Sequence, residues 1–166
     1  INILKKSALT NFLLILSSFF ILTYSFIISD FSLLLVSNNS HSLKPIIYKI
    51  SGVWGNHEGS LLLWVLILSG FTFLVSRKNS EINPKLLFSI IGVQTVILCL
   101  FLAFILFTSN PFERVEILPL DGRGLNPLLQ DPGLALHPPM LYIGYVGLSV
   151  SFSFAVGALI TGEINK

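Results

Sequence analysis

Four long apolar runs restrict what this chain can fold into. Each is close to the roughly 20 residues that a helix needs to cross a bilayer at about 1.5 Å per residue. The chain is 53% hydrophobic and 11% charged, whereas soluble domains are about 25% charged, so a single soluble core could not bury these side chains. The sequence predicts an all-α integral membrane protein with about four transmembrane helices, at residues 7–28, 60–76, 85–108 and 140–160.

The second apolar run is the shortest, and it allows an alternative interpretation. In that alternative the run lies in the membrane interface, which leaves three spans. Trp64 and Phe71 nevertheless suit a span that begins at the membrane surface just after Gly59, because aromatic residues favour the interface. We therefore expect four spans.

The basic residues predict an orientation. Cytoplasmic loops carry more Lys and Arg than the loops on the other side, and placing the N-terminus inside gives six basic residues there against four outside. The two longer loops, 30–59 and 109–137, then share the outer face, where we expect them to meet. The inner residues are Lys5, Lys6, Arg77, Lys78, Lys85 and Lys166, and the outer ones are Lys44, Lys49, Arg114 and Arg123.

The second long loop ends in an unusual stretch, GRGLNPLLQDPGLALHPPMLY at 122–142. Proline suits the first turn of a helix, so Pro138 and Pro139 predict that His137 lies at the N-cap edge of the last span. The positive end of the helix dipole disfavours imidazolium. The ring would then be neutral, the state that binds a metal or haem iron. The alternative is a helix-capping turn with a structural histidine.

Polar residues precede this histidine among Leu and Pro. Asn126, Gln130 and Asp131 are placed either to bond to the backbone or to orient the imidazole ring, as outer groups around a metal ligand often do.

The first long loop ends in WGNHEGSLLLW, at 54–64. His57 and Glu58 are titratable at the depth where the bilayer begins, which is costly unless they are paired or solvated. They could touch a cofactor or relay protons. Alternatively, Trp54 and Trp64 are interfacial anchors and Glu58 caps the next helix. His41 fits a solvated loop residue.

Several classes of function are disfavoured. A net charge of +2 without a basic stripe does not predict nucleic-acid binding. The only cysteine, Cys99, cannot form a disulfide within the chain. No Asp, Glu, Lys, Arg or His lies well inside a span, so the chain alone is a poor pump or carrier.

Small and polar residues within the spans are typical of helix contacts in membranes. Gln94 and Thr95 predict hydrogen bonds between helices. Close approach of the last helix to its neighbours is predicted by Gly144, Gly147, Ser151 and Gly157.

Long stretches of the chain resemble a known family. WGNHEGSLLLWVLILSG at 54–70, and FTSNPF at 107–112 together with GRGLNPLLQDPGLALHPPMLYIGYVG at 122–147, are similar to CcmF, the cytochrome c maturation haem lyase subunit of bacteria and mitochondria. The resemblance covers nearly the whole chain. It implies that residues 1–166 form the N-terminal part of a polytopic haem lyase membrane domain.

The resemblance implies that haem b is held at the outer membrane face for thioether attachment to apocytochrome c. It identifies His137 with an axial ligand of the haem iron. No catalytic residue is assigned. The supporting residues at the haem site would be Trp54, His57, Glu58, Asn126, Gln130, Asp131, Pro138, Pro139 and Tyr142.

The family's tryptophan-rich loop and its other haem ligands lie beyond the part that this chain resembles. The haem would therefore be shared with a partner chain or a further part of the protein. The implied partners are other maturation subunits, including a chain with the tryptophan-rich loop, together with apocytochrome c, a haem chaperone and membrane lipid. No nucleic acid is implied.

The resemblance implies a location in the mitochondrial inner membrane or, alternatively, in a bacterial plasma membrane. The abundance of Phe, Ile, Leu, Asn, Ser and Lys is what AT-rich coding would produce, and it favours the mitochondrial location. The long loops would face the intermembrane space or periplasm. Two other functions remain open: a structural or assembly subunit of a larger inner-membrane complex, and a quinone or haem transporter subunit.

Overall fold

The structure is a computed structural model that describes residues 2–77, 82–124, 126–127 and 130–163. Within these ranges it is helical, with one isolated β-bridge between Leu33 and Arg114. Four helices, α1, α4, α5 and α6, are long and apolar enough to cross a membrane, which confirms the fold class. The helices are α1 (Asn2–Ile27), α2 (Leu34–Asn39), α3 (Ile46–Gly52), α4 (His57–Arg77), α5 (Pro84–Thr108) and α6 (Pro132–Thr161).

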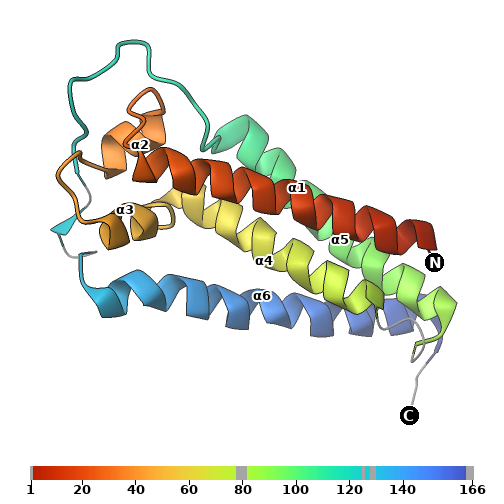
Figure 1. Ribbon diagram of the computed structural model, residues 1–166. Coiled ribbons are helices and arrows are strands. Elements are labelled where there is room, and N and C mark those ends of the chain that lie inside the picture. The colour runs from red at the N-terminus through yellow and green to blue at the C-terminus, as the bar shows by residue number, and fades with distance from the viewer. Residues whose placement is uncertain (1, 78–81, 125, 128–129, 164–166) are drawn as a thin grey trace.

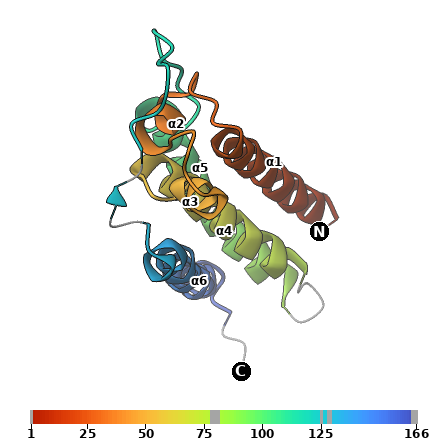
Figure 2. The ribbon, with the colours of Figure 1, turned by 60° about the vertical axis from the view of Figure 1, so that its left-hand side comes forward.

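The four long helices form a bundle in which α4 packs against α1, α5 and α6. The chain runs along the bundle four times, and both termini lie at the same end (Figure 1). Turned by 60°, α4 and α5 are seen between α1 and α6 (Figure 2). Because α4 is a 21-residue helix held by three neighbours, the three-span alternative is wrong.

A polar network joins three of the long helices. Gln94 on α5 is fully buried, and its Nε2 donates to the hydroxyls of Ser153 at 3.0 Å and Ser149 at 3.3 Å on α6. Its Oε1 accepts from Thr72 Oγ1 on α4 at 3.3 Å. The predicted helix-to-helix bonding is therefore confirmed for Gln94. Thr95 instead donates to the Ile91 carbonyl of its own helix.

The small residues of α6 do not all serve close packing. A Cβ added at Gly157 would lie 3.0 Å from the Ile90 side chain, and one at Gly147 would lie 3.7 Å from Phe71. Gly157 therefore confirms the expected close approach, whereas a Cβ at Gly147 would make only an ordinary van der Waals contact. A Cβ at Gly144 would meet nothing within 4 Å, and Ser151 is exposed, so the prediction is wrong for those two.

The two long loops meet at the end of the bundle opposite the termini (Figure 1). The first contains two short helices, α2 and α3, where the sequence predicts only loop. The Leu34 amide donates to the Glu113 carbonyl at 2.8 Å, and the Arg123 amide donates to the Ser37 carbonyl at 2.7 Å. The expected meeting of the loops is confirmed, while the membrane side on which they lie stays a prediction.

His41 belongs to this loop contact. Its Nε2 lies 3.5 Å from Asp121 Oδ2, and its Nδ1 accepts from the Leu43 amide. His41 is thus a partly exposed residue with partners in both loops, and it is not simply solvated. Two of the basic residues assigned to the opposite end, Lys78 and Lys166, lie outside the described residues.

The start of α6 corrects the predicted boundary. The helix begins at Pro132 and not near residue 140, with Asp131 as the N-cap whose Oδ1 accepts from the Leu134 amide at 3.0 Å. His137 is therefore inside the helix, followed by two internal prolines. Both Asp–Pro and His–Pro–Pro can start a helix, and the earlier signal determines the boundary because its cap is satisfied.

Candidate functional site

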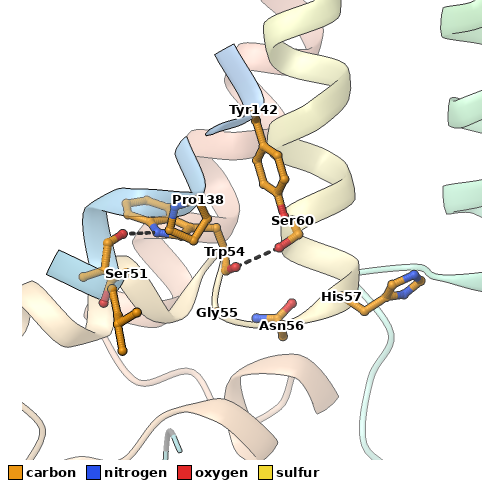
Figure 3. Close-up of a pocket in the computed structure, with 10 residues that line it drawn as sticks. Ser51, Trp54, Gly55, Asn56, His57, Ser60, Pro138 and Tyr142 are labelled. Atoms are coloured by element: carbon orange, nitrogen blue, oxygen red, sulfur yellow. Dashed lines mark hydrogen bonds between the residues drawn. The ribbon is translucent and has the colours of Figure 1, made fainter. Parts of the chain in front are cut away.

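A pocket of about 360 Å³ lies at the loop end of the bundle, between the turn that joins α3 to α4 and the first turns of α6 (Figure 3). This volume is within the range of small-molecule sites, roughly 300 to 1,000 Å³. The pocket joins the two unusual stretches of the sequence, at 54–64 and 122–142. It is lined by Ser51, Trp54, Gly55, Asn56, His57, Ser60, Leu134, Ala135, Pro138 and Tyr142.

Trp54 connects the two stretches directly. Its Nε1 donates to the Ala135 carbonyl at 2.7 Å. In a regular helix that carbonyl would accept from the amide of residue 139, but Pro139 has no N–H. The indole therefore supplies a donor to a carbonyl that the proline has left without its helical partner. On its other side, Trp54 stacks on Phe19 of α1, with ring centroids 6.5 Å apart.

The turn that carries Trp54 is fixed by its neighbours. Ser60 Oγ donates to the Trp54 carbonyl at 2.7 Å, and Asn56 Oδ1 accepts from the Gly59 amide at 2.7 Å, which caps the start of α4. Residue 59 must lack a side chain, since a Cβ there would be 1.6 Å from the Val53 carbonyl oxygen. The pattern WGNHEGS is thus largely explained by the shape of this turn.

Asn56, and not Glu58, makes the capping hydrogen bond of α4. Glu58 lies in the first turn, where the helix dipole favours an anion. Its carboxylate has no hydrogen bond in the described part of the chain. The alternative in which Glu58 itself caps the helix is wrong in this respect.

His57 lines the pocket, but its ring turns away from α6. Nδ1 shares a 3.3 Å hydrogen bond with Ser109 Oγ just after α5. The ring also meets the Phe104 ring edge-on, with centroids 6.2 Å apart. Figure 3 shows the imidazole pointing away from Pro138 and Tyr142. The structure therefore brings Trp54 against the start of α6, while it directs the His57 ring to the end of α5.

His137 is exposed on α6 and does not line the pocket. Within the described residues its ring has no hydrogen-bond partner, so it does not cap the helix. Its neighbours three and four positions away on the same helix surface are apolar: Leu134 is 47%, Met140 is 69% and Leu141 is 41% exposed. The imidazole thus stands free on an apolar surface.

The remaining predicted residues have mainly local roles. Asp131 caps α6, and Asn126 and Gln130 are exposed, each with an interaction inside the chain. Pro138 and Pro139 are half-buried. Tyr142 packs edge-on against Trp64 of α4, with centroids 5.5 Å apart.

Sequence reasoning missed Asn56 and Ser60. Asn is a preferred N-cap residue, and Asn56 stands five positions before the start of the apolar run at Leu61, so the first could have been identified as a cap. Nothing in the sequence indicates that Ser60 bonds backwards to the Trp54 carbonyl.

The possible metal ligands of this chain suit a haem iron better than a metal ion that is held by protein side chains alone. Among the described residues there is no group of three or more His, Cys, Asp or Glu that could hold a metal ion. A haem iron needs only one or two axial ligands from protein. A free imidazole on an apolar helix surface fits that smaller requirement, with one ligand coming from this chain.

Comparison with known proteins matches residues 54–165 to the family described as "Cytochrome C assembly protein". The chain belongs to this family. The matched region begins at Trp54 and includes His137, so it covers both sides of the pocket.

Curated relatives agree with this assignment. The cytochrome c-type biogenesis protein ccl1 of Rhodobacter capsulatus is 57% identical over 159 residues, which is 96% of this chain and 24% of the relative. CcmF of Escherichia coli is 45% identical over 156 residues, or 93% of this chain and 24% of the relative. The chain thus spans about a quarter of the length of these relatives. No solved structure matches it.

These relatives are cytochrome c-type biogenesis proteins, which supports a role for this chain in cytochrome c maturation. The chain thus combines membership of the cytochrome c assembly family with four helices that are long and apolar enough to cross a membrane.

Proposed function

We propose that this chain is part of the haem lyase that attaches haem to apocytochrome c, and that His137 gives one axial ligand to a haem b at the loop end of the bundle. The observation that carries the proposal is the free imidazole of His137 on an apolar surface of α6. Family membership over residues 54–165 supports the reaction class.

The chain's own residues would serve mainly to position the histidine. Asp131 fixes where α6 begins, and Trp54 holds its second turn through the Ala135 carbonyl. Haem, when bound, supplies the vinyl groups that become joined to the cysteine thiols of apocytochrome c. Holding both reactants in place is then the main source of rate, because orientation alone is worth several kcal/mol.

A second axial ligand would come from outside this chain. The proposed source is a partner chain, or a further part of the protein, that carries the family's tryptophan-rich loop. Other maturation subunits, a haem chaperone, apocytochrome c and membrane lipid complete the proposed partners. We place the chain in the inner membrane of a mitochondrion or a bacterium, with the two long loops facing the intermembrane space or periplasm.

The test is His137→Ala in the assembled complex. The fold should survive, because the side chain is exposed and makes no hydrogen bond among the described residues. Haem content, measured by a pyridine haemochrome spectrum, and the yield of holocytochrome c should fall together. Added imidazole should restore part of both by entering the vacated axial position.

The matched control is His41→Ala, which removes another histidine from the same end of the bundle but away from α6. It should leave haem content unchanged. Full haem content and full maturation in an assembled His137→Ala complex would contradict the ligand assignment.

A structural or assembly subunit is the second candidate, and the wide exposure of α6 favours it. Leu148 is 64% and Leu159 is 84% exposed on this helix, as expected of a surface covered by lipid or by neighbouring helices. In that case His137→Ala would leave haem content unaltered, and loss of the whole chain would prevent assembly.

A further inference from the structure

A second cavity lies between α1, α4 and α5, and it extends from Leu4 and Ser7, beside Lys5 and Lys6 at the start of α1, towards the middle of the bundle. Its volume is about 320 Å³. Thr95 follows the first residue of α5 by 11 positions, about 17 Å along the helix axis, which is near the middle of a bilayer core roughly 30 Å thick. The lining residues are Leu4, Ser7, Ala8, Asn11, Ser69, Thr72, Ile91 and Thr95.

The lining is polar but carries no charge. Ser69 and Thr95 each donate a hydroxyl hydrogen to a carbonyl of their own helix. The Thr72 hydroxyl shares its hydrogen between the Leu68 carbonyl at 2.9 Å and Gln94 Oε1 at 3.3 Å. The oxygen lone pairs of all three hydroxyls remain as acceptors. Ser69 is 1% exposed and Thr72 is 4% exposed. Ser69 and Thr72 are therefore shielded from lipid, and the cavity is the space that lies beside them.

Two residues of α1 add hydrogen-bonding groups that are not in use. The hydroxyl of Ser7 and the amide of Asn11 have no partner in the part of the chain that the structure describes, and both residues are exposed at the rim. An amide offers two donors and one acceptor. Leaving such a group in hydrocarbon without a partner costs several kcal/mol.

Water meets the requirements of this cavity. A buried water needs room for about one probe sphere and two to four polar partners. The cavity has space for several waters, and it offers acceptors on α4 and α5 opposite donors on α1. Lipid chains would fill the same space but would leave the Asn11 amide and the hydroxyl oxygens without partners.

We propose that this cavity is a hydrated site at membrane depth, in which water molecules bridge Asn11 and Ser7 of α1 to Ser69, Thr72 and Thr95. The site is continuous with the buried network, because Thr72 both lines the cavity and bonds to Gln94. Water there would connect α1 through Gln94 to α6. This inference does not depend on haem binding.

The experiment uses thiol labelling of the full chain in proteoliposomes. Cys99, the only cysteine, is first replaced by alanine. Thr95→Cys is then treated with a charged methanethiosulfonate, which reacts with the thiolate and so requires water at the sulfur. The matched control is Val96→Cys, one residue along the same helix and 60% exposed on its outer surface.

The cavity thiol should react at least about tenfold faster than the lipid-facing thiol, since a one-unit rise in thiol pKa in apolar surroundings already lowers the thiolate fraction tenfold. Adding Asn11→Leu should slow the reaction of Thr95→Cys and leave Val96→Cys unchanged. Ser69→Cys, a nearly isosteric change, is the second probe and should behave as Thr95→Cys does.

Equal slow rates at positions 95 and 96 would show a dry or lipid-filled cavity and overturn the proposal. Equal fast rates would also overturn it, because water would then reach α5 from all sides. If Thr95→Cys does not fold, the reaction rate of Ser69→Cys is compared with that of Val96→Cys, and the same outcomes decide.

Discussion

The indole nitrogen of Trp54 lies 2.7 Å from the backbone oxygen of Ala135, 81 positions along the chain. This bond exists because Pro139 cannot donate to that oxygen. The tryptophan of one unusual stretch thus completes the backbone hydrogen bonding of the other. The two stretches are parts of one local structure, whatever ligand lies beside them.

Trp54→Phe should reduce stability by about 1 to 2 kcal/mol, the typical cost of leaving the carbonyl of a buried residue, here Ala135, without its donor. Phenylalanine keeps the aromatic contact with Phe19 but has no N–H. Unfolding in detergent, followed by temperature or denaturant, measures the effect. Trp64→Phe is the control, because Trp64 contacts Phe101 and Tyr142 through its ring. Equal losses in both variants would mean that the hydrogen bond is not the cause.

Gly59→Ala should be among the most damaging small changes in the chain. The new Cβ would lie 1.6 Å from the Val53 carbonyl oxygen, and backbone on both sides would have to move. We expect a loss of more than about 3 kcal/mol or failure to accumulate. Gly144→Ala makes the same chemical change where nothing lies within 4 Å, and should be neutral or stabilising by up to about 1 kcal/mol. Similar stability of Gly59→Ala and Gly144→Ala would contradict the prediction that residue 59 must lack a side chain.

The sequence was sufficient to predict the four spans and the meeting of the long loops. Both follow from run length and from the need of each apolar helix to cross the bilayer. Gln94 was also predictable as a link between helices, because an amide at that depth needs partners.

The local geometry of the site was not predictable in the same way. His–Pro–Pro and Asp–Pro are equally good start signals for α6, and the choice depends on a cap that only the folded chain shows. Similarly, the ring of His57 could turn to α6 or to Ser109. Side-chain direction depends on neighbours brought together by tertiary packing, which residue spacing does not specify.

Loop topology gives a further prediction. In the Cys99→Ala background, cysteines at Leu43 and Leu120, both strongly exposed in the two long loops, should be labelled from the same side of sealed membranes. Ile3→Cys, exposed at the opposite end, should be labelled only from the other side. An impermeant maleimide measures this in oriented vesicles. Labelling of Leu43→Cys and Leu120→Cys from different sides would rule out the bundle as described.

The contact between the long loops should weaken in acid. Asp121 accepts from the Ser42 hydroxyl at 2.5 Å and the Ser42 amide at 3.0 Å, and these bonds lower the pKa of the Asp121 carboxyl from 3.8 to about 2. A depressed carboxyl pKa stabilises the folded loops above pH 3.8, and that contribution is lost as pH falls through about 2.

We therefore expect the Ser42 and Gly122 amides, which both donate to Asp121, to lose protection from hydrogen exchange between about pH 4 and pH 2. The Leu34 amide, which donates to the backbone oxygen of Glu113, is the internal control and should stay protected. Asp121→Asn has no charge to lose, so its Ser42 amide should show no such pH dependence. Parallel loss at Ser42 and Leu34 would instead mean that the loops unfold together, and that titration of Asp121 is not the cause.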